Sequence, residues 1–235
     1  MDYRSKLISP QQAVSMVQSG DYIVTGLGVG AAHAFLSVLH TAAHRLQDVL
    51  ISTCLLMQDY PCLNDPQYSG SFVQDSWFYG AATRRAHSAS TAGTSYVPCS
   101  LHFAASKRLS HRKPTLYIGS AAMPDRHGNI SLSCSNTYEM QMIREADRVV
   151  LEINPNYPRT FGDGLLRIDE VDYLIEADYP VPTLPNTAPN NKDRAIGGLI
   201  ASYIHDGDCL QLGIGGMPNA LAEQLMDKKD LGIHT

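Results

Sequence analysis

The 235-residue chain contains the beginning of one structural unit twice. Residues 20–32 read GDYIVTGLGVGAA and residues 207–219 read GDCLQLGIGGMPN, so one constant offset aligns a Gly-Asp pair and two later glycines. In each copy an apolar β-like run leads into a glycine-rich loop, an apolar helical stretch and a second β-like run, at 49–53 or 231–235. This repetition predicts duplicated domains, and we expect the second domain to be present only in part.

The order strand, glycine loop, helix, strand is typical of a parallel α/β sheet. Ser9 and Pro10 suit the N-cap and first position of an opening helix, which precedes a strand at 22–25. The sequence predicts an α/β fold with an open, mostly parallel sheet flanked by helices. We further expect helices at about 32–44, 98–109, 136–146 (capped by Asn136 or Thr137) and from 193, strands at 49–53, 115–120, 148–153 and 169–177, and a hairpin strand at 130–133 after a turn at 124–129.

A stretch rich in proline and asparagine, residues 179–191, predicts a linker without regular structure. Residues 1–178 are therefore expected to form the first domain. Residues 192–235 are expected to hold the first elements of a similar second domain, too few to bury a complete core.

Composition excludes several classes of function. Hydrophobic residues make up 44% of the chain, as in an ordinary globular protein, and a net charge of −5 without a basic stripe argues against nucleic-acid or membrane-surface binding. No apolar window approaches the roughly 18 residues that a membrane span needs. Five cysteines without CxxC spacing indicate reduced thiols in the cytoplasm, with neither a disulfide frame nor a zinc site.

A glycine loop between a buried strand and a helix exposes backbone N–H groups, which bind anions or stabilise negative charge on an oxygen. Gly26, Gly28 and Ala31 also match a dinucleotide-binding fingerprint. That fingerprint needs an acidic residue at the end of the next strand, where this chain has Ser52 and Thr53. Nicotinamide binding is therefore disfavoured, and no metal site is predicted.

The second loop, GIGGMP at 213–218, resembles the GxGxxP motif of the acetyl-CoA hydrolase/transferase family, close to its 4-hydroxybutyrate and butyryl-CoA:acetate CoA-transferases. The segments NPNYPRTFGD at 154–163, FYG at 78–80 with the arginine pair at 84–85, YVP at 96–98 and DRHGN at 125–129 also look like family segments. The similarity extends along the whole chain.

The resemblance implies transfer of coenzyme A between a short acyl-CoA and a small carboxylate, through a thioester on an active-site glutamate. By this resemblance, Gly215 and Gly216 would hold the thioester oxygen, and Gly213 and Pro218 would shape the turn. It implies no permanently bound cofactor, because the coenzyme A thioester is the substrate. Tyr96 and Pro98 would line an acyl pocket or only turn the chain, and possible substrate contacts follow a strand at Asn154, Arg159, Thr160 and Asp163.

Arg159 has two open interpretations at this stage, an ion pair with Asp163 or a contact with a substrate carboxylate or phosphate. The basic residues at 84–85 and 107–113 also have two open interpretations, contact with an anionic ligand or a position on the solvated surface.

In the family the nucleophilic glutamate directly follows a segment like LGIHT at 231–235. We therefore expect the nucleophile just beyond Thr235, a missing C-terminal domain, an inactive isolated chain and a homo-oligomeric parent protein. Glu139 and Glu145 are expected on a helix surface, which leaves Glu152 and Glu176 as the only other glutamates to consider.

Two alternatives remain open. A sugar-phosphate isomerase of related fold also uses glycine loops, but the sparse lysines count against its phosphate pocket. A non-catalytic assembly module would need a separate subunit to supply the glutamate.

Overall fold

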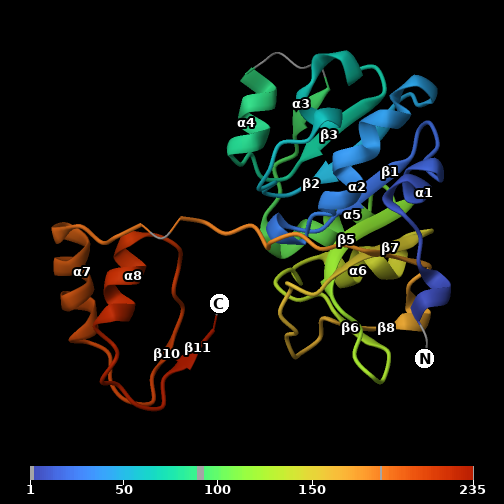
Figure 1. Ribbon diagram of the computed structural model, residues 1–235. Helices are drawn as coiled ribbons and strands as arrows, with labels where there is room; N and C mark the ends of the chain where they lie inside the picture. The colour runs from blue at the N-terminus through green and yellow to red at the C-terminus, as the bar shows by residue number, and fades with distance from the viewer. Residues whose placement is uncertain (1–2, 89–92, 186, 235) are drawn as a thin grey trace. The chain divides into compact units, whose positions relative to one another are not determined.

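The computed structural model describes residues 3–88, 93–185 and 187–234 (Figure 1). The chain divides into two compact units, residues 1–182 and 183–235, and each is described by itself. Residues 177–185 and 187–190 contain no helix or strand.

The first unit is built on a seven-stranded sheet in the order β4-β3-β2-β1-β5-β7-β9, and every neighbouring pair is parallel. The predicted open parallel α/β sheet is confirmed. Strand order changes direction between β1 and β5, which makes their carboxyl ends a topological switch point, where ligands bind in open α/β sheets. The strands are β1 (Tyr22–Thr25), β2 (Val49–Thr53), β3 (Phe72–Ser76), β4 (Thr94–Tyr96), β5 (Leu116–Ala122), β7 (Val149–Asn154) and β9 (Tyr173–Glu176).

Helices flank the sheet, and two hydrophobic cores lie against its faces. Successive residues of a strand point to opposite faces, so Ile23 belongs to one core and Val24 to the other. Phe35 of α2 packs in the first core and Met142 of α6 in the second. With η for a 3-10 helix, the helices are η1 (Tyr3–Lys6), α1 (Pro10–Ser15), η2 (Gly28–Gly30), α2 (His33–Val38), η3 (Leu39–Arg45), α3 (Pro61–Asn64), η4 (Pro66–Tyr68), α4 (Ala81–Ser88), η5 (Leu101–Phe103), α5 (Ala104–Leu109), α6 (Glu139–Glu145) and η6 (Ile168–Glu170).

The ends of several helices differ from the prediction. Ser9 is the N-cap of α1, as expected, and it also forms a capping box with Gln12. The helix expected at 32–44 changes to 3-10 geometry after Val38, where Thr41 Oγ1 donates a 2.7 Å hydrogen bond to the Val38 carbonyl. The helix expected from Asn136 or Thr137 begins only at Glu139, without a side-chain cap.

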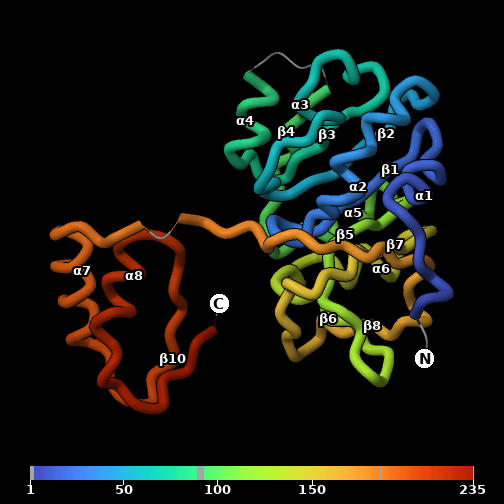
Figure 2. The backbone as a smooth tube through the Cα atoms, viewed as in Figure 1, coloured from blue at the N-terminus to red at the C-terminus, as the bar shows by residue number. Residues whose placement is uncertain are grey.

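The predicted hairpin is wrong. β6 (Asn129–Ser131) pairs antiparallel with β8 (Leu165–Arg167), and the two lie side by side in Figure 2. β5 cannot take β6 as a partner because β1 and β7 already occupy both of its edges. The β6–β8 pair instead forms a separate two-stranded sheet.

The second unit repeats the order strand, loop, helix, parallel strand. β10 (Cys209–Leu210) pairs in parallel with β11 (Gly232–Ile233), and α8 (Gly216–Glu223) lies between them in sequence. α7 (Asn191–Ala201) packs against α8 at Gly197, where an added Cβ would lie 3.0 Å from the Ala220 carbonyl carbon and from Leu221 N. The helix begins two residues before the predicted position because Asn190 forms the capping box with Asp193. The small core of the second unit contains Ile204, Leu221 and Leu225.

Gly26, at the start of the first glycine loop, lies close to the backbone of Gly30. A Cβ at Gly26 would lie 2.4 Å from the Gly30 carbonyl oxygen, so Gly26→Ala must displace backbone. We expect Gly26→Ala to lower the free energy of unfolding of the first unit by about 1–3 kcal/mol, measured by urea unfolding. Gly70→Ala is the control, because a Cβ there meets nothing within 4 Å. Equal stability of the two variants would contradict the close approach.

Candidate active site

An apolar cavity of about 380 Å³ lies where loops leave the carboxyl ends of β1, β2 and β3. Its size is in the range of small-molecule sites. Phe78 and Leu101 are about half exposed (54% and 56%), which places large apolar side chains in contact with solvent at this site. The lining residues are Leu27, Cys54, Leu55, Trp77, Phe78, Cys99, Leu101 and Ala104.

A second groove of about 290 Å³ shares Cys99 with this cavity and is more basic. Lys107, Arg108 and His111 line it, and the Lys107 ammonium lies 5.9 Å from the centre of the Phe103 ring. The Arg108 guanidinium forms an ion pair with the buried Asp75 of β3. Lys107 and His111 are the basic side chains of this groove that could meet an anion.

The structure places the two predicted acyl-pocket residues beside this region. Tyr96 ends β4 and is 56% exposed, and its ring meets the Tyr79 ring edge-on at 5.2 Å. Pro98 lines the basic groove. Both residues therefore belong to the β4–α5 segment that borders the apolar cavity through Cys99.

Arg159 does not pair with Asp163, the protein partner considered from the sequence. Its guanidinium pairs with the Asp125 carboxylate at 2.9 Å and donates to the Asn129 carbonyl at 3.3 Å. Asn129 donates to the Asp125 carboxylate from its backbone and its side chain, and these hydrogen bonds, with the help of Arg159, lower the pKa of Asp125 to about 2. The suggested pair with Asp163 is wrong, because the turn at 125–129 presents the closer carboxylate.

The other residues of the 154–163 segment separate into structural and open positions. Asn154 is buried and its amide donates to the Tyr179 carbonyl at 2.9 Å. Thr160 Oγ1 donates to the Ser133 carbonyl at 3.0 Å. Asp163 lines a polar cavity of about 450 Å³ together with Arg144 of α6.

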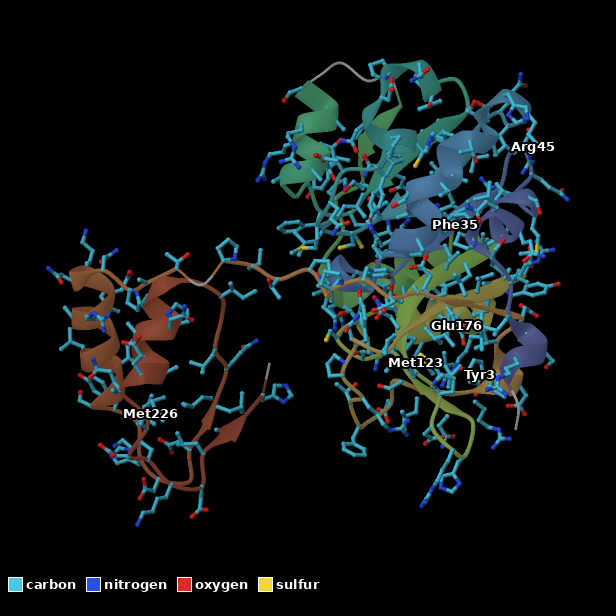
Figure 3. All side chains as sticks on the ribbon, in the orientation of Figure 1. Tyr3, Phe35, Arg45, Met123, Glu176 and Met226 are labelled. Atoms are coloured by element: carbon cyan, nitrogen blue, oxygen red, sulfur yellow. The ribbon has the colours of Figure 1, made fainter. Side chains whose placement is uncertain are left out.

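The two glutamates considered as substitute nucleophiles lie in opposite environments. Glu152 is completely buried, and its carboxyl group accepts hydrogen bonds from Ala34 N, Phe35 N and the Tyr179 hydroxyl at 2.7–3.0 Å. Burial raises its pKa to about 7. Glu176, at the end of β9, is exposed and accepts a 3.0 Å hydrogen bond from Tyr3, which lies beside it in Figure 3.

Glu139 has a role that the sequence did not predict. It is buried rather than on a helix surface, and its carboxylate accepts hydrogen bonds from Leu27 N at 2.8 Å and Ser135 Oγ at 2.6 Å. It also accepts from the backbone N–H groups of Thr137 and Tyr138. Glu139 therefore fixes the first glycine loop to the beginning of α6.

The N–H groups of the first glycine loop donate hydrogen bonds to other groups of the protein. Gly28 N donates to the Cys54 carbonyl at 2.9 Å, Gly30 N to the Leu27 carbonyl at 2.8 Å, and Leu27 N to Glu139. Ala32 N donates to Thr25 Oγ1 at 3.0 Å. Because these donors are satisfied internally, the first loop is unsuited to hold an anion.

The second glycine loop has the opposite character. Gly215, with φ of 138°, is the N-cap of α8, and Gly216 begins the helix. Cβ atoms at Gly213 and Gly215 would each lie 3.9 Å from the Pro218 ring, so the loop closes over that proline. Within the described residues, the N–H groups of Gly213, Gly215 and Gly216 have no hydrogen-bond partner. Free donors at a helix N-terminus suit a negative oxygen.

The described part of the chain contains no group of three or more His, Cys, Asp or Glu side chains able to hold a metal ion. None of the helices in residues 3–88, 93–185 and 187–234 has the length and apolar character to cross a membrane.

Comparison with known proteins agrees with this architecture. The chain is 36% identical over 243 residues to a succinyl-CoA:cyclohexane-1-carboxylate CoA transferase of Geobacter metallireducens, covering 100% of this chain and 53% of that protein. It is 30% identical to a 4-hydroxybutyrate coenzyme A transferase of Clostridium kluyveri, covering 99% and 54%. The chain thus spans about half the length of the curated relatives that it matches.

Solved structures show the same fold. RipA from Yersinia pestis superposes with a TM-score of 0.88 at 28% identity, over 99% of this chain and 56% of RipA. A 4-hydroxybutyrate CoA-transferase from Porphyromonas gingivalis superposes with a TM-score of 0.75 at 25% identity, over 99% and 54%. The model of the acetyl-CoA hydrolase/transferase N-terminal domain matches residues 1–185. The chain therefore belongs to the acetyl-CoA hydrolase/transferase family, as the resemblance of its motifs predicted.

Proposed function

We propose that this chain is the N-terminal half of a CoA-transferase. The enzyme would move coenzyme A between a short acyl-CoA, such as acetyl-, 4-hydroxybutyryl- or butyryl-CoA, and a small carboxylate. Named relatives with these activities support the substrate class. No cationic side chain among the described residues lines the apolar cavity, and a sugar phosphate would need one there, so we favour the CoA-transferase over the isomerase alternative.

The observation that carries the proposal is the difference between the two glycine loops. The first loop satisfies its N–H groups with Cys54, Glu139 and its own backbone. The N–H groups of Gly213, Gly215 and Gly216 in the second loop have no partner among the residues that the structure describes. When a carboxylate attacks the carbonyl carbon of the thioester, negative charge builds on the carbonyl oxygen. Fixed N–H groups stabilise that charge. We assign this task to Gly215 and Gly216.

The covalent step requires a glutamate that we place just beyond Thr235. Its carboxylate attacks the acyl-CoA carbonyl carbon and releases the coenzyme A thiolate, leaving a mixed anhydride. The thiolate then attacks the glutamyl carbonyl, releases the acid and leaves the glutamyl-CoA thioester. We also propose that the parent protein is a cytoplasmic homo-oligomer.

The test compares two substitutions at one position, in protein extended to the length of the relatives. Gly216→Pro removes an N–H at the first position of α8, where proline suits helix geometry. Gly216→Ala keeps the N–H and adds the same Cβ near the Asp193 carboxylate. We expect kcat for acyl exchange to be roughly 10²–10³-fold lower in Gly216→Pro than in Gly216→Ala.

Three results would count against the proposal. Equal kcat values would remove the role of the Gly216 N–H. Turnover by the 235-residue chain alone would contradict the missing nucleophile. Absence of a hydroxylamine-trapped glutamyl product in the extended, acyl-CoA-treated protein would contradict the thioester.

A further inference from the structure

We propose that the apolar cavity selects acyl groups with an unsubstituted hydrocarbon chain, aliphatic or alicyclic and larger than acetyl, over hydroxylated or dicarboxylic ones. This inference rests on the proposed function and specifies which acyl groups the first unit would accept. It is carried by the juxtaposition of Leu27, Leu55, Trp77, Phe78 and Leu101 around about 380 Å³ at the carboxyl ends of three strands.

The walls come from residues that directly follow parallel strands. Leu27 follows β1 by two residues, Leu55 follows β2 by two, and Trp77 and Phe78 follow β3 at once. The loops of an open sheet carry its ligand contacts at this end. Here these positions hold leucines and aromatic residues, so the sheet presents hydrocarbon where a ligand would enter.

The polar atoms near the cavity do not provide a charged partner for a substrate. Cys54 is buried, and burial raises the pKa of its thiol to about 12, so the group stays neutral. The basic side chains of α5, Lys107 and Arg108, line the neighbouring groove, and Arg108 is already paired with Asp75. A second carboxylate of a dicarboxylic acyl group would therefore lose its hydration without a compensating cation.

These contacts set the expected selectivity. Each buried methylene contributes about fourfold to binding. A hydroxyl group in an apolar pocket costs up to roughly 10²-fold. A buried, unpaired carboxylate costs more than either. We therefore expect butanoyl-CoA and cyclohexanecarbonyl-CoA to exceed 4-hydroxybutanoyl-CoA in kcat/KM, and succinyl-CoA to be the poorest of the four.

Trp77 provides a direct measurement, because it lines the cavity and is the only tryptophan of the chain. The 235-residue chain is titrated with cyclohexanecarboxylate, butanoate, 4-hydroxybutanoate and succinate while Trp77 fluorescence is recorded. We expect a saturable change with the first two acids and none with succinate at the same concentrations. An equal response to succinate, or no response to any acid, would overturn the inference.

A matched pair of variants separates this cavity from general surface effects. Leu101→Lys puts a cation beside the cavity, and Leu184→Lys makes the same change at a leucine of equal exposure (57%) in the linker segment. Leu101→Lys should abolish the fluorescence response to cyclohexanecarboxylate and create one to succinate. Leu184→Lys should behave as the wild type, and the reversal is a readout that loss of stability would not give.

Kinetics of the extended protein distinguish the two proposals. Transferase activity that prefers succinyl-CoA would overturn the hydrocarbon selectivity and leave the proposed function intact. Absence of transfer from every acyl-CoA would overturn the proposed function, while the Trp77 titration would still decide whether the cavity binds hydrocarbon.

Discussion

Raising the pH from 5 to 8 is expected to destabilise wild-type protein by about 2–3 kcal/mol relative to the Glu152→Gln variant. Burial raises the pKa of Glu152 from 4.5 to about 7 in the folded chain. The folded state therefore holds a proton that the unfolded state has released between these two values. The stability that protonated Glu152 contributes is fully present below pH 4.5 and is lost as the pH rises through 7. Each unit of difference between the folded and unfolded pKa corresponds to about 1.4 kcal/mol.

The hydrogen bonds to Glu152 oppose the effect of burial on its pKa. Ala34 N, Phe35 N and the Tyr179 hydroxyl all donate to its carboxyl group, at 3.0, 2.7 and 2.8 Å. Hydrogen bonds of this kind favour the charged carboxylate and lower the pKa. Burial is the larger effect, so the pKa of Glu152 is still raised to about 7.

Other titrating groups surround Glu152, which is why the comparison with Glu152→Gln is needed. The ring of His33 meets the Tyr179 ring edge-on at 4.8 Å, and burial lowers the pKa of His33. Its contribution to stability therefore falls as the pH decreases, opposite to that of Glu152. Tyr60, Tyr157 and Tyr179 have pKa values raised by burial and stay neutral across this range.

Urea unfolding at pH 5 and pH 8 measures this difference. Glutamine has a similar shape and does not titrate between pH 5 and pH 8, so the variant should lose the pH-dependent part that belongs to residue 152. Glu145→Gln, at an exposed residue of α6 that pairs with Lys113, is the control and should leave the pH dependence unchanged. If wild type and Glu152→Gln changed equally between pH 5 and pH 8, Glu152 would not carry the proton.

The parallel sheet was predictable because its strands carry strong local signals. The segments at 22–25, 49–53 and 148–153 are apolar runs bounded by turns, as fully buried strands should be. The edge of the sheet was not. β4 and α4 lie in a segment at 59–100 of scattered Tyr, Ser and Gly, where neither helical nor strand periodicity stands out.

The site was predictable only where consecutive residues form a recognisable motif. The glycine and proline positions of the second loop were identified from their motif, and their assignment to an oxyanion remains a prediction. Long-range partners were not predictable. Asp125 forms an ion pair with Arg159, 34 residues away in sequence, and Glu139 accepts a hydrogen bond from Leu27 N, 112 residues away. No local pattern specifies such pairs. The apolar cavity was missed for the same reason, since its walls come from four separate loops.

The largest loss of stability is expected from Arg108→Met, at about 3–5 kcal/mol. Asp75 is 4% exposed, its Oδ2 pairs with the Arg108 guanidinium, and its Oδ1 has no hydrogen-bond partner within the described residues. Methionine fills a similar volume without a charge, so the variant leaves a buried carboxylate uncompensated. The same guanidinium lies 5.5 Å from the centre of the Trp77 ring, so Trp77 fluorescence reports unfolding of this region.

Two further variants decide whether charge, rather than packing, is the cause. The double variant Asp75→Asn/Arg108→Met removes both charges and should recover most of the loss, because a buried pair replaced as a whole is far less costly than a pair that is broken. Arg85→Met breaks the pair with Asp59, whose side chains are 58% and 48% exposed, and should cost under about 1 kcal/mol. Equal costs for Arg85→Met and Arg108→Met, or no recovery in the double variant, would show that Arg108 stabilises the unit through its packing on Trp77 and Tyr22 instead.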